Sequence, residues 1–284
     1  MNSEYIPRYH GKSATMNVSL SIVRDHKLLT RNTDRVAIEE PLQIMVSYNG
    51  SKAKNYAIIM RTPTMDKFLG TGFLFSEGVI RNREDIISVR GVSDYEIAVD
   101  NTIGFDLKHE FKGAHKRNFV VNSSCGVCGK NSIDDIFLRV GKLNRSSLRA
   151  SSKLITELPK MLVQHQKVFE ETGGVHAAAI FDEDGKIITS AEDVGRHNAV
   201  DKVIGYMLWN NLIPARNFIM QVSGRAGFEI VQKAAIAGIP VISSVSAPSS
   251  LSIETADALG ITLICFVREN GFNVYTHQER VILE

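Results

Sequence analysis

The residues of this sequence with the clearest chemical potential are two closely spaced cysteines, Cys125 and Cys128. Glycines flank both of them within the segment 123–130. Thiols at this spacing can form a local disulfide, bind a soft metal ion or carry a sulfur atom, and the glycines let the backbone move in each case. Because positive charge and helix N-termini favour the reactive thiolate, Lys130 and a helix expected after residue 132 favour an activated pair.

A structural zinc site is the main alternative use of the two cysteines. Zinc needs further ligands, and His176 and His197 could supply them. The third cysteine, Cys265, lies in an apolar strand and is expected to be inert core. A thioredoxin-type redox pair is less favoured, because that motif opens a helix directly after a strand and here a glycine-rich segment intervenes. On these residues alone the zinc alternative stays open.

His176 invites a comparison with zinc-dependent nucleobase deaminases. Those enzymes place His-x-Glu before Pro-Cys-x-x-Cys, and the glutamate transfers protons. In this chain Ala178 stands where the glutamate would be, no proline precedes Cys125, and the cysteines come before the histidine. The sequence therefore fails the deaminase pattern. Taken alone, His176 is interpreted as a core histidine whose hydrogen bonds are satisfied.

Two strand-to-helix turns could bind an anion. The turn Ser223-Gly224-Arg225 would bring backbone N–H groups, a hydroxyl and a guanidinium to the N-terminus of the following helix, where a phosphate binds well. The segment 246–250 is a second turn of the same kind, and in an α/β sheet the two would open on the same edge. Together they predict a phosphate-bearing ligand of about the size of a nucleotide.

The segment 192–202 is densely polar and lies at another strand-to-helix junction. Asp193 and Asn198 could cap the helix there. Arg196 and His197 are harder to explain by capping, and they suit an anionic ligand. This junction is therefore a third candidate for anion binding.

The pattern of apolar residues predicts an α/β protein with two unequal domains. Residues 1–17 form a loose N-terminal tail, 18–118 a small α+β domain, and 119–284 a larger layered α/β domain in which strands and helices alternate. Helices are expected at 64–75, 156–171, 197–209, 228–237 and 253–259, and strands at 36–38, 42–46, 57–60, 119–121, 175–181, 187–189, 218–222 and 241–245, before a hairpin at 262–275.

The composition limits which classes of partner this protein is expected to bind. The chain has 284 residues, with 33 Lys and Arg against 31 Asp and Glu, so its net charge of +2 offers no general attraction to nucleic acid or an anionic membrane. No apolar run approaches the ~18 residues of a membrane span, and the N-terminus lacks a secretory signal pattern. Three cysteines in so long a chain fit a reducing compartment. We therefore expect a cytoplasmic protein.

Seven motifs in a fixed order resemble the formate dehydrogenase accessory sulfurtransferases, the FdhD family. The resemblance covers nearly the whole chain from about residue 34 onward. The motifs are Glu39-Glu40-Pro41-Leu42, Gly72-Phe73-Leu74 with Glu77-Gly78, Ser124-Cys125-Gly126-Val127-Cys128-Gly129, Thr172-Gly173-Gly174-Val175-His176-Ala177-Ala178, the run from Asp193 to Lys202, Ser223-Gly224-Arg225 and Ser246-Ala247-Pro248.

The resemblance implies a sulfurtransferase that carries sulfur as a persulfide. Such a protein accepts sulfane sulfur from a cysteine desulfurase and passes it to the molybdenum cofactor with two molybdopterin guanine dinucleotides, which then serves the formate dehydrogenase apoprotein. Cys125 matches the persulfide-bearing position and Cys128 its partner. No permanent cofactor and no resident metal are expected.

The resemblance also assigns a cofactor-binding segment and a fold. The C-terminal domain is expected to resemble the cytidine deaminase fold. The sequence leaves the oligomeric state open, and a homodimer is one alternative. Ala191 and Gly227 depart from the pattern, which has an arginine and a serine at these positions. The segment associated with cofactor binding comprises Phe266, Val267, Arg268, Glu269, Asn270 and Gly271.

Two functions compete with sulfur transfer. A non-catalytic chaperone of the molybdenum cofactor would bind the same ligand without carrying sulfur, so it would tolerate loss of Cys125. A zinc-dependent, deaminase-like hydrolase is the less favoured alternative, and metal analysis would reveal it.

Overall fold

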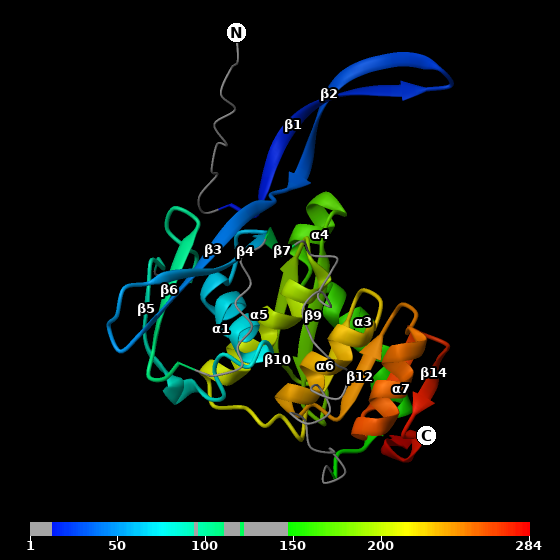
Figure 1. Cartoon of the computed structure of the whole chain (residues 1–284). Helices are drawn as coiled ribbons and strands as arrows, with labels where there is room; N and C mark the ends of the chain where they lie inside the picture. The colour runs from blue at the N-terminus through cyan, green and yellow to red at the C-terminus, as the bar shows by residue number, and fades with distance from the viewer. Residues whose placement is uncertain (1–12, 94–95, 111–119, 122–146) are drawn as a thin grey trace.

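The computed structural model describes residues 13–93, 96–110, 120–121 and 147–284. Within them the chain is a mixed α/β protein with two larger sheets, one of five strands and one of six. Figure 1 shows these sheets on opposite sides of two packed helices, α1 (Asp66–Ser76) and α5 (Arg196–Trp209). The predicted α/β class is confirmed at this level. The finer prediction of a deaminase-like domain remains a prediction.

The five-stranded sheet has the order β5-β6-β3-β4-β7. β3 and β4 form an antiparallel hairpin, and at its turn both Asn49 and Gly50 adopt positive φ, as this dipeptide predicts. α1 packs against this sheet. The strands are β3 (Glu40–Tyr48), β4 (Lys54–Arg61), β5 (Ile86–Arg90), β6 (Thr102–Leu107) and β7 (Val120–Val121).

A long antiparallel hairpin, β1 (Thr15–Arg24) and β2 (Lys27–Ala37), projects from the body of the molecule (Figure 1). β1 begins inside the tail predicted for residues 1–17. The strand predicted at 36–38 overlaps only the end of β2. The alternation of Met16, Val18, Leu20 and Ile22 with polar residues is typical of a strand, and it was overlooked at the sequence level. At the base of the hairpin, the Thr15 hydroxyl and Arg35 both contact Glu171, at 3.1 and 3.3 Å.

The six-stranded sheet has the order β10-β9-β11-β12-β13-β14, and β11, β12 and β13 are parallel. Ala178 and Ile180 of β9 pack into the core shared with α5, whereas Ala177 and Ala179 pack into the core under helix α3. The strands are β9 (His176–Phe181), β10 (Ile187–Asp193), β11 (Ile219–Val222), β12 (Val241–Ser244), β13 (Thr262–Arg268) and β14 (Gly271–Thr276).

The helices around this sheet follow the predictions with two corrections. The first is that the last helix begins at Ser250 and not at 253, because Ser249 caps it there. The second is that the helix predicted at 156–171 is two helices, α3 (Ser152–Val163) and α4 (Lys167–Thr172). The Ser151 hydroxyl caps α3 by accepting from Leu154 N at 3.1 Å, so the helix starts earlier than predicted and Pro159 lies in its interior. α6 (Phe228–Ala237) and α7 (Ser250–Leu259) end at glycines in the left-handed conformation.

Short elements complete the chain. β8 (Ala150–Ser151) pairs in parallel with β15 (Val281–Ile282), which ties the C-terminus to the start of α3. Two 3-10 turns lie at Arg83–Asp85 and Gln278–Arg280. No described helix is long and apolar enough to cross a membrane.

Two glycines let α1 and α5 approach closely. A Cβ on Gly72 would overlap the backbone carbonyl of Asp201, and a Cβ on Gly205 would overlap that of Phe68. The largest hydrophobic core accordingly contains residues of both large sheets. β7, on the far side of the boundary predicted at 118/119, pairs with β4 of the first sheet. The division into domains remains a prediction.

Candidate functional site

The segments singled out from the sequence meet at one edge of the six-stranded sheet. The pairing of His176 with Asp193, and of Val222 with both Ala178 and Ser244, brings the start of β9 and the ends of β10, β11 and β12 together. The two predicted turns lie side by side there, since Ala226 N donates to the Ala247 carbonyl at 3.2 Å. The carboxyl edge of parallel strands is where ligands bind in α/β sheets.

The turn after β11 is held rigidly in place. Ser223 Oγ accepts a hydrogen bond from Ala177 N at 2.8 Å, and Ser223 N donates to the Ala177 carbonyl at 2.9 Å. The Ser244 hydroxyl donates to the Gly224 carbonyl at 2.8 Å. Arg225, by contrast, is exposed at the edge. The fixed backbone thus presents, next to the start of α6, a guanidinium that pairs with none of the residues the structure describes.

The segment predicted to bind the cofactor reaches the same edge with different roles for its members. Phe266 is 41% exposed and adopts a φ of 56°, while its N–H donates to the Ser246 carbonyl at 3.2 Å. Val267 is core. Arg268 donates to the carbonyls of Val245 and Val267 at 2.6 and 2.7 Å, so it fixes the turn. Glu269 and Asn270 form the hairpin turn between β13 and β14, and Gly271 is the first residue of β14, paired with Arg268.

Arg196 and Arg225, the arginine pair, carry the positive charge of this edge. Burial lowers the pKa of Arg196, and so does the nearby Arg225, while Glu229 opposes both effects. Arg196 Nε is buried and has no hydrogen-bond partner among the described residues. A buried donor without a partner, next to a second guanidinium, is suited to an anion.

His197, the other cation predicted for this site, already faces a carboxylate. Its Nε2 lies 3.2 Å from Glu229 Oε2, and both side chains are largely buried. The structure therefore brings Arg196 and Arg225 together at the edge and directs His197 toward α6.

The interpretation of His176 as a satisfied core histidine is wrong. Its ring is only half-buried and forms no hydrogen bond with any described residue. Burial lowers the pKa of His176, as do Arg196 and Arg225, and only Asp193 raises it. The imidazole is therefore neutral near pH 7 and both of its nitrogens are available to a ligand.

Asp193 and Asn198 do not cap α5, whose N-cap is Gly195 without a side-chain bond. Asp193 Oδ2 lies 2.7 Å from Lys202 Nζ, and both side chains are fully buried. Asp193 Oδ1 accepts from Gly195 N and from Asn198 Nδ2, each at 2.8 Å. Much of the polar density of segment 192–202 thus forms a buried network that holds the start of α5.

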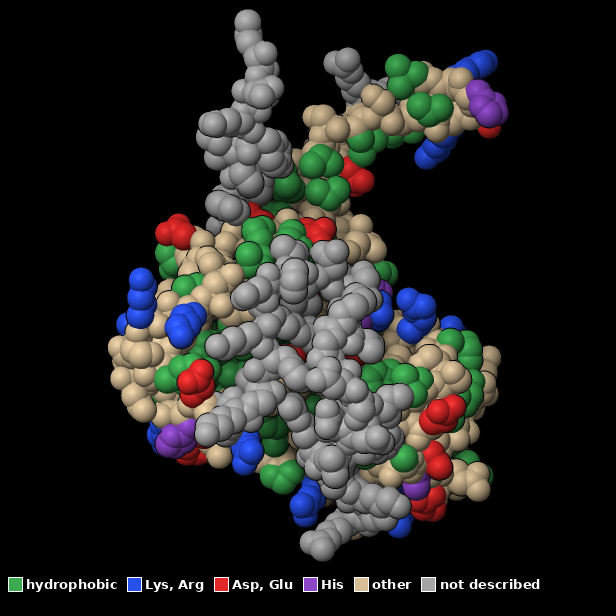
Figure 2. Space-filling view, viewed as in Figure 1, with side chains coloured by type: hydrophobic (Ala, Val, Ile, Leu, Met, Phe, Trp, Pro, Cys, Tyr) green, Lys and Arg blue, Asp and Glu red, His purple; other side chains and the backbone are tan. Residues whose placement is uncertain are grey.

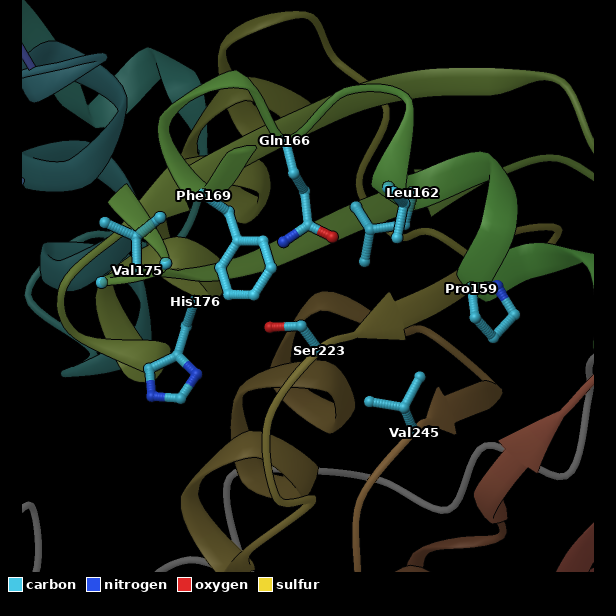
Figure 3. Close-up of a pocket in the computed structure, with 11 residues that line it drawn as sticks. Pro159, Leu162, Gln166, Phe169, Val175, His176, Ser223 and Val245 are labelled. Atoms are coloured by element: carbon cyan, nitrogen blue, oxygen red, sulfur yellow. The ribbon is translucent and has the colours of Figure 1, made fainter. Parts of the chain in front are cut away.

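A cavity of about 510 Å³ opens on the α3 and α4 side of the edge. Figure 3 shows Gln166 and Ser223 reaching toward it from opposite sides, with Phe169 and Leu162 beside Gln166. Its volume lies in the range of small-molecule sites. The lining residues are Pro159, Leu162, Val163, Gln166, Phe169, Gly173, Gly174, Val175, His176, Ser223 and Val245.

Two buried polar groups lie next to this cavity in the sheet. Gln221 of β11 comes two residues before Ser223, and Ser243 of β12 comes two residues before Val245. Because side chains alternate along a strand, Gln221 and Ser243 lie on the same face of the sheet as these two lining residues. Gln221 Oε1 and Ser243 Oγ have no hydrogen-bond partner among the residues described. This cavity has no signal in the local sequence, because its wall depends on the break between α3 and α4. The Glu192 carboxylate fixes that wall by accepting from Val168 N and Phe169 N at 2.9 and 2.8 Å.

Cys125 and Cys128 lie outside the described residues. The persulfide assignment and the zinc alternative therefore both remain predictions. Among the residues that the structure does describe, no group of three or more His, Cys, Asp or Glu side chains could hold a metal ion. Cys265 is fully buried, as predicted, and burial raises its pKa to about 12.

Comparison with known proteins decides the family. A model of the FdhD/NarQ family matches residues 37–282, which include the cysteine pair and every segment of the sheet edge. This chain belongs to the FdhD/NarQ family. The resemblance derived from the seven motifs is thereby confirmed.

Several members of the FdhD/NarQ family are close in sequence. The sulfur carrier protein FdhD of Thermoplasma volcanium is 52% identical over 252 residues, which are 88% of this chain and 90% of that protein. Its namesake in Picrophilus torridus is 47% identical over 92% of this chain and 96% of that protein. The Streptomyces coelicolor protein of the same name is 42% identical over 92% and 93%.

A solved structure shares the fold. The crystal structure of a Desulfotalea psychrophila protein, described as a formate dehydrogenase accessory protein, superposes with a TM-score of 0.76. It covers 95% of this chain and all of that chain, at 24% sequence identity. At this identity the likeness supports the fold.

Proposed function

We propose that this protein is a sulfur carrier that serves formate dehydrogenase. The observation that carries the proposal is the alignment, over nearly nine-tenths of the chain, with relatives named sulfur carrier proteins at up to 52% identity. The aligned family region contains the pair Cys125 and Cys128. A carrier of this kind needs one thiol to hold sulfur and gains from a second thiol to release it.

The sulfur enters as a persulfide. The Cys125 thiolate attacks the outer sulfur of a persulfide on a cysteine desulfurase, and the desulfurase thiolate leaves. The Cys128 thiolate then attacks the inner sulfur, forms a Cys125–Cys128 disulfide and releases hydrosulfide to the molybdenum of the acceptor. A thiol reductant returns the pair to the reduced state, so atoms and electrons balance.

The acceptor in this proposal is the molybdenum cofactor with two molybdopterin guanine dinucleotides, destined for the formate dehydrogenase apoprotein. Its diphosphate groups match the chemistry of the arginine pair beside the turn after β11, and Ser223 holds this turn in place through its bonds to Ala177. Arg196 Nε, a buried donor with no partner in the described part of the chain, supports this placement. Phe266 at the same edge is exposed enough to contact a guanine ring.

The sulfur-carrier proposal is tested by mass spectrometry of the intact chain after incubation with a desulfurase and cysteine. We expect a gain of one sulfur atom that is lost on thiol reduction and absent in Cys125→Ala. Cys265→Ala is the matched control and should gain sulfur normally, because the Cys265 thiol is fully buried. An adduct that persists in Cys125→Ala would contradict the assignment.

A non-catalytic chaperone of the same cofactor is the second candidate, favoured by the ligand-sized cavity at the sheet edge. Formate dehydrogenase maturation would then proceed normally with Cys125→Ala. The zinc hydrolase is tested by metal analysis: stoichiometric zinc that survives dialysis would support it, and well below one zinc per chain would support the free thiols.

A further inference from the structure

His176 lies where the cavity meets the arginine pair. It is the first residue of β9, and it lines the cavity. A Cβ on Gly224 would lie 3.2 Å from His176 Nδ1 and 3.6 Å from Arg196 Cβ. The imidazole and Arg196 therefore both lie against Gly224 of the turn at the sheet edge.

The carboxylates around this point are already engaged. Asp193 of β10 faces His176 but is paired with Lys202 at 2.7 Å. Glu229 of α6 faces Arg196 but lies 3.2 Å from His197. The charged groups that act on the imidazole are thus Arg196 from α5, Arg225 from the turn after β11, and the neutralised Asp193. Among the described residues, two arginines therefore act on the imidazole against one carboxylate, Asp193, which is itself paired with Lys202.

We propose that His176 contacts the anionic group of the bound ligand and takes up a proton when that group enters between Arg196 and Arg225. The inference rests on the proposed function in one respect, that the anion is a diphosphate. The protonated imidazole would donate a charge-assisted hydrogen bond to a phosphate oxygen, in addition to the two guanidinium groups.

The direction of the pH dependence follows from the charges. In the free protein, burial and the two arginines hold the pKa of His176 below its usual range. A bound diphosphate offsets the arginine charges, so the pKa of His176 rises in the complex. Affinity therefore increases as pH falls between the upper, bound pKa and the lower, free pKa, by up to about tenfold per pH unit for one proton. Below the free pKa the gain stops.

The test uses the full chain and GDP as the probe. The His176 ring proton resonances are followed by NMR from pH 5 to pH 8.5, with and without saturating GDP, and GDP affinity is measured by calorimetry over the same range. The same measurements on His176→Gln serve as the reference. GDP's own phosphate titrates equally with both proteins, so the difference between them reports on His176. His165→Gln, at an exposed histidine outside the cavity, is the matched control.

We expect GDP to raise the midpoint of the His176 titration and the affinity of the natural chain to rise more steeply toward low pH than that of His176→Gln. An unchanged midpoint, equal slopes, or no binding of GDP at any pH would overturn the inference. The sulfur-carrier proposal is judged separately by the mass gain on Cys125. A normal mass gain together with an unchanged His176 midpoint would reject only the role of His176. A raised midpoint without a mass gain would reject only the sulfur chemistry.

Discussion

At the scale of single residues, burial decides which thiol stays out of the chemistry. Cys265 is fully buried in β13, and the loss of solvent raises its pKa to about 12. At pH 8 the thiolate fraction is then on the order of one in ten thousand. Only the thiolate reacts at a useful rate.

Iodoacetamide at pH 8 should therefore leave Cys265 unmodified in the native chain and label it once guanidinium chloride unfolds the protein. Peptide mass spectrometry measures the extent of labelling at each cysteine. Labelling of native Cys265 at the rate of a free thiol would show that β13 opens readily, and would weaken Cys265→Ala as a control for the sulfur adduct.

Arg225 is the residue whose loss should most directly weaken binding of an anion. It is exposed beside Arg196 at the edge. Removing one charge-assisted contact costs about 1.5–3 kcal/mol, so Arg225→Ala should bind GDP roughly tenfold to a hundredfold more weakly in a calorimetric titration. Arg24→Ala, at an exposed arginine near the tip of the hairpin, should bind normally. Unchanged affinity in Arg225→Ala would place the phosphate elsewhere.

The sequence could predict the turn at Ser223-Gly224-Arg225 as an anion site, but it could not predict that His176 lies beside this turn. Ser223-Gly224-Arg225 between a strand and a helix has a pattern typical of phosphate binding. That Gly224 also makes room for the imidazole of His176 depends on the pairing of β9 with β11, which places them together from 48 positions apart. Such a contact has no signal in local sequence.

At the scale of elements, α1 and α5 approach each other so closely that the contact leaves no room for a side chain at Gly72 or Gly205. Gly72→Ala would drive a methyl group into the carbonyl of Asp201, and a backbone carbonyl cannot rotate away as a side chain can. The helices must separate, which disturbs the core between the two sheets. We expect a loss of about 3 kcal/mol in the free energy of unfolding, the upper end of overpacking costs.

Urea unfolding followed by circular dichroism measures this loss. Gly104→Ala in β6 is the matched control, because a Cβ there meets nothing within 4 Å and the backbone has no positive φ. It should unfold at the natural midpoint or slightly above. An equal midpoint for Gly72→Ala would mean that α5 shifts without cost.

Helix ends with strong local signals were predictable, and elements stabilised by tertiary contacts were not. α6 matched its prediction to the residue, because apolar spacing and Gly238 define both ends. The break between α3 and α4 depends on Gln166, which is buried against the cavity, and on Glu192 from another element. The projecting hairpin does carry a strand pattern, since Met16, Val18, Leu20 and Ile22 alternate with polar residues. Among the described strands β1 pairs with β2 alone, and nothing in the pattern shows that the hairpin leaves the body of the molecule.

At the scale of the whole molecule, a buried ionic network joins the two large sheets. Lys202 of α5 donates to the Thr62 carbonyl at 3.0 Å and to Thr64 Oγ1 at 2.8 Å, both just after β4. Thr62 N in turn donates to Asp193 Oδ2 at 3.2 Å. A run of polar residues has the same sequence pattern whether its side chains bind a ligand or pair with one another inside the protein. Segment 192–202 therefore supported two interpretations until the packing of β4 against α5 was known.

Lys202→Met tests how much this network contributes. The substitution keeps the shape of the side chain and leaves Asp193 as a buried carboxylate without its cation. Breaking one partner of a buried pair costs about 3–5 kcal/mol, so the urea midpoint should fall accordingly. Lys153→Met, at an exposed lysine of α3, is the control and should change stability by less than ~0.5 kcal/mol.

In the urea unfolding of Lys202→Met, the fluorescence of Trp209 can be used to follow the junction between the two large sheets. Its ring lies 3.9 Å from both Lys67 Nζ and Arg83 Cζ, so its fluorescence follows the contact between α5 and the N-terminal elements. Because the core is continuous across that contact, the fluorescence and circular dichroism transitions of Lys202→Met should move together. If fluorescence alone shifted to lower urea, the N-terminal elements would separate from α5 before the six-stranded sheet unfolds, and the network would join two independently stable units.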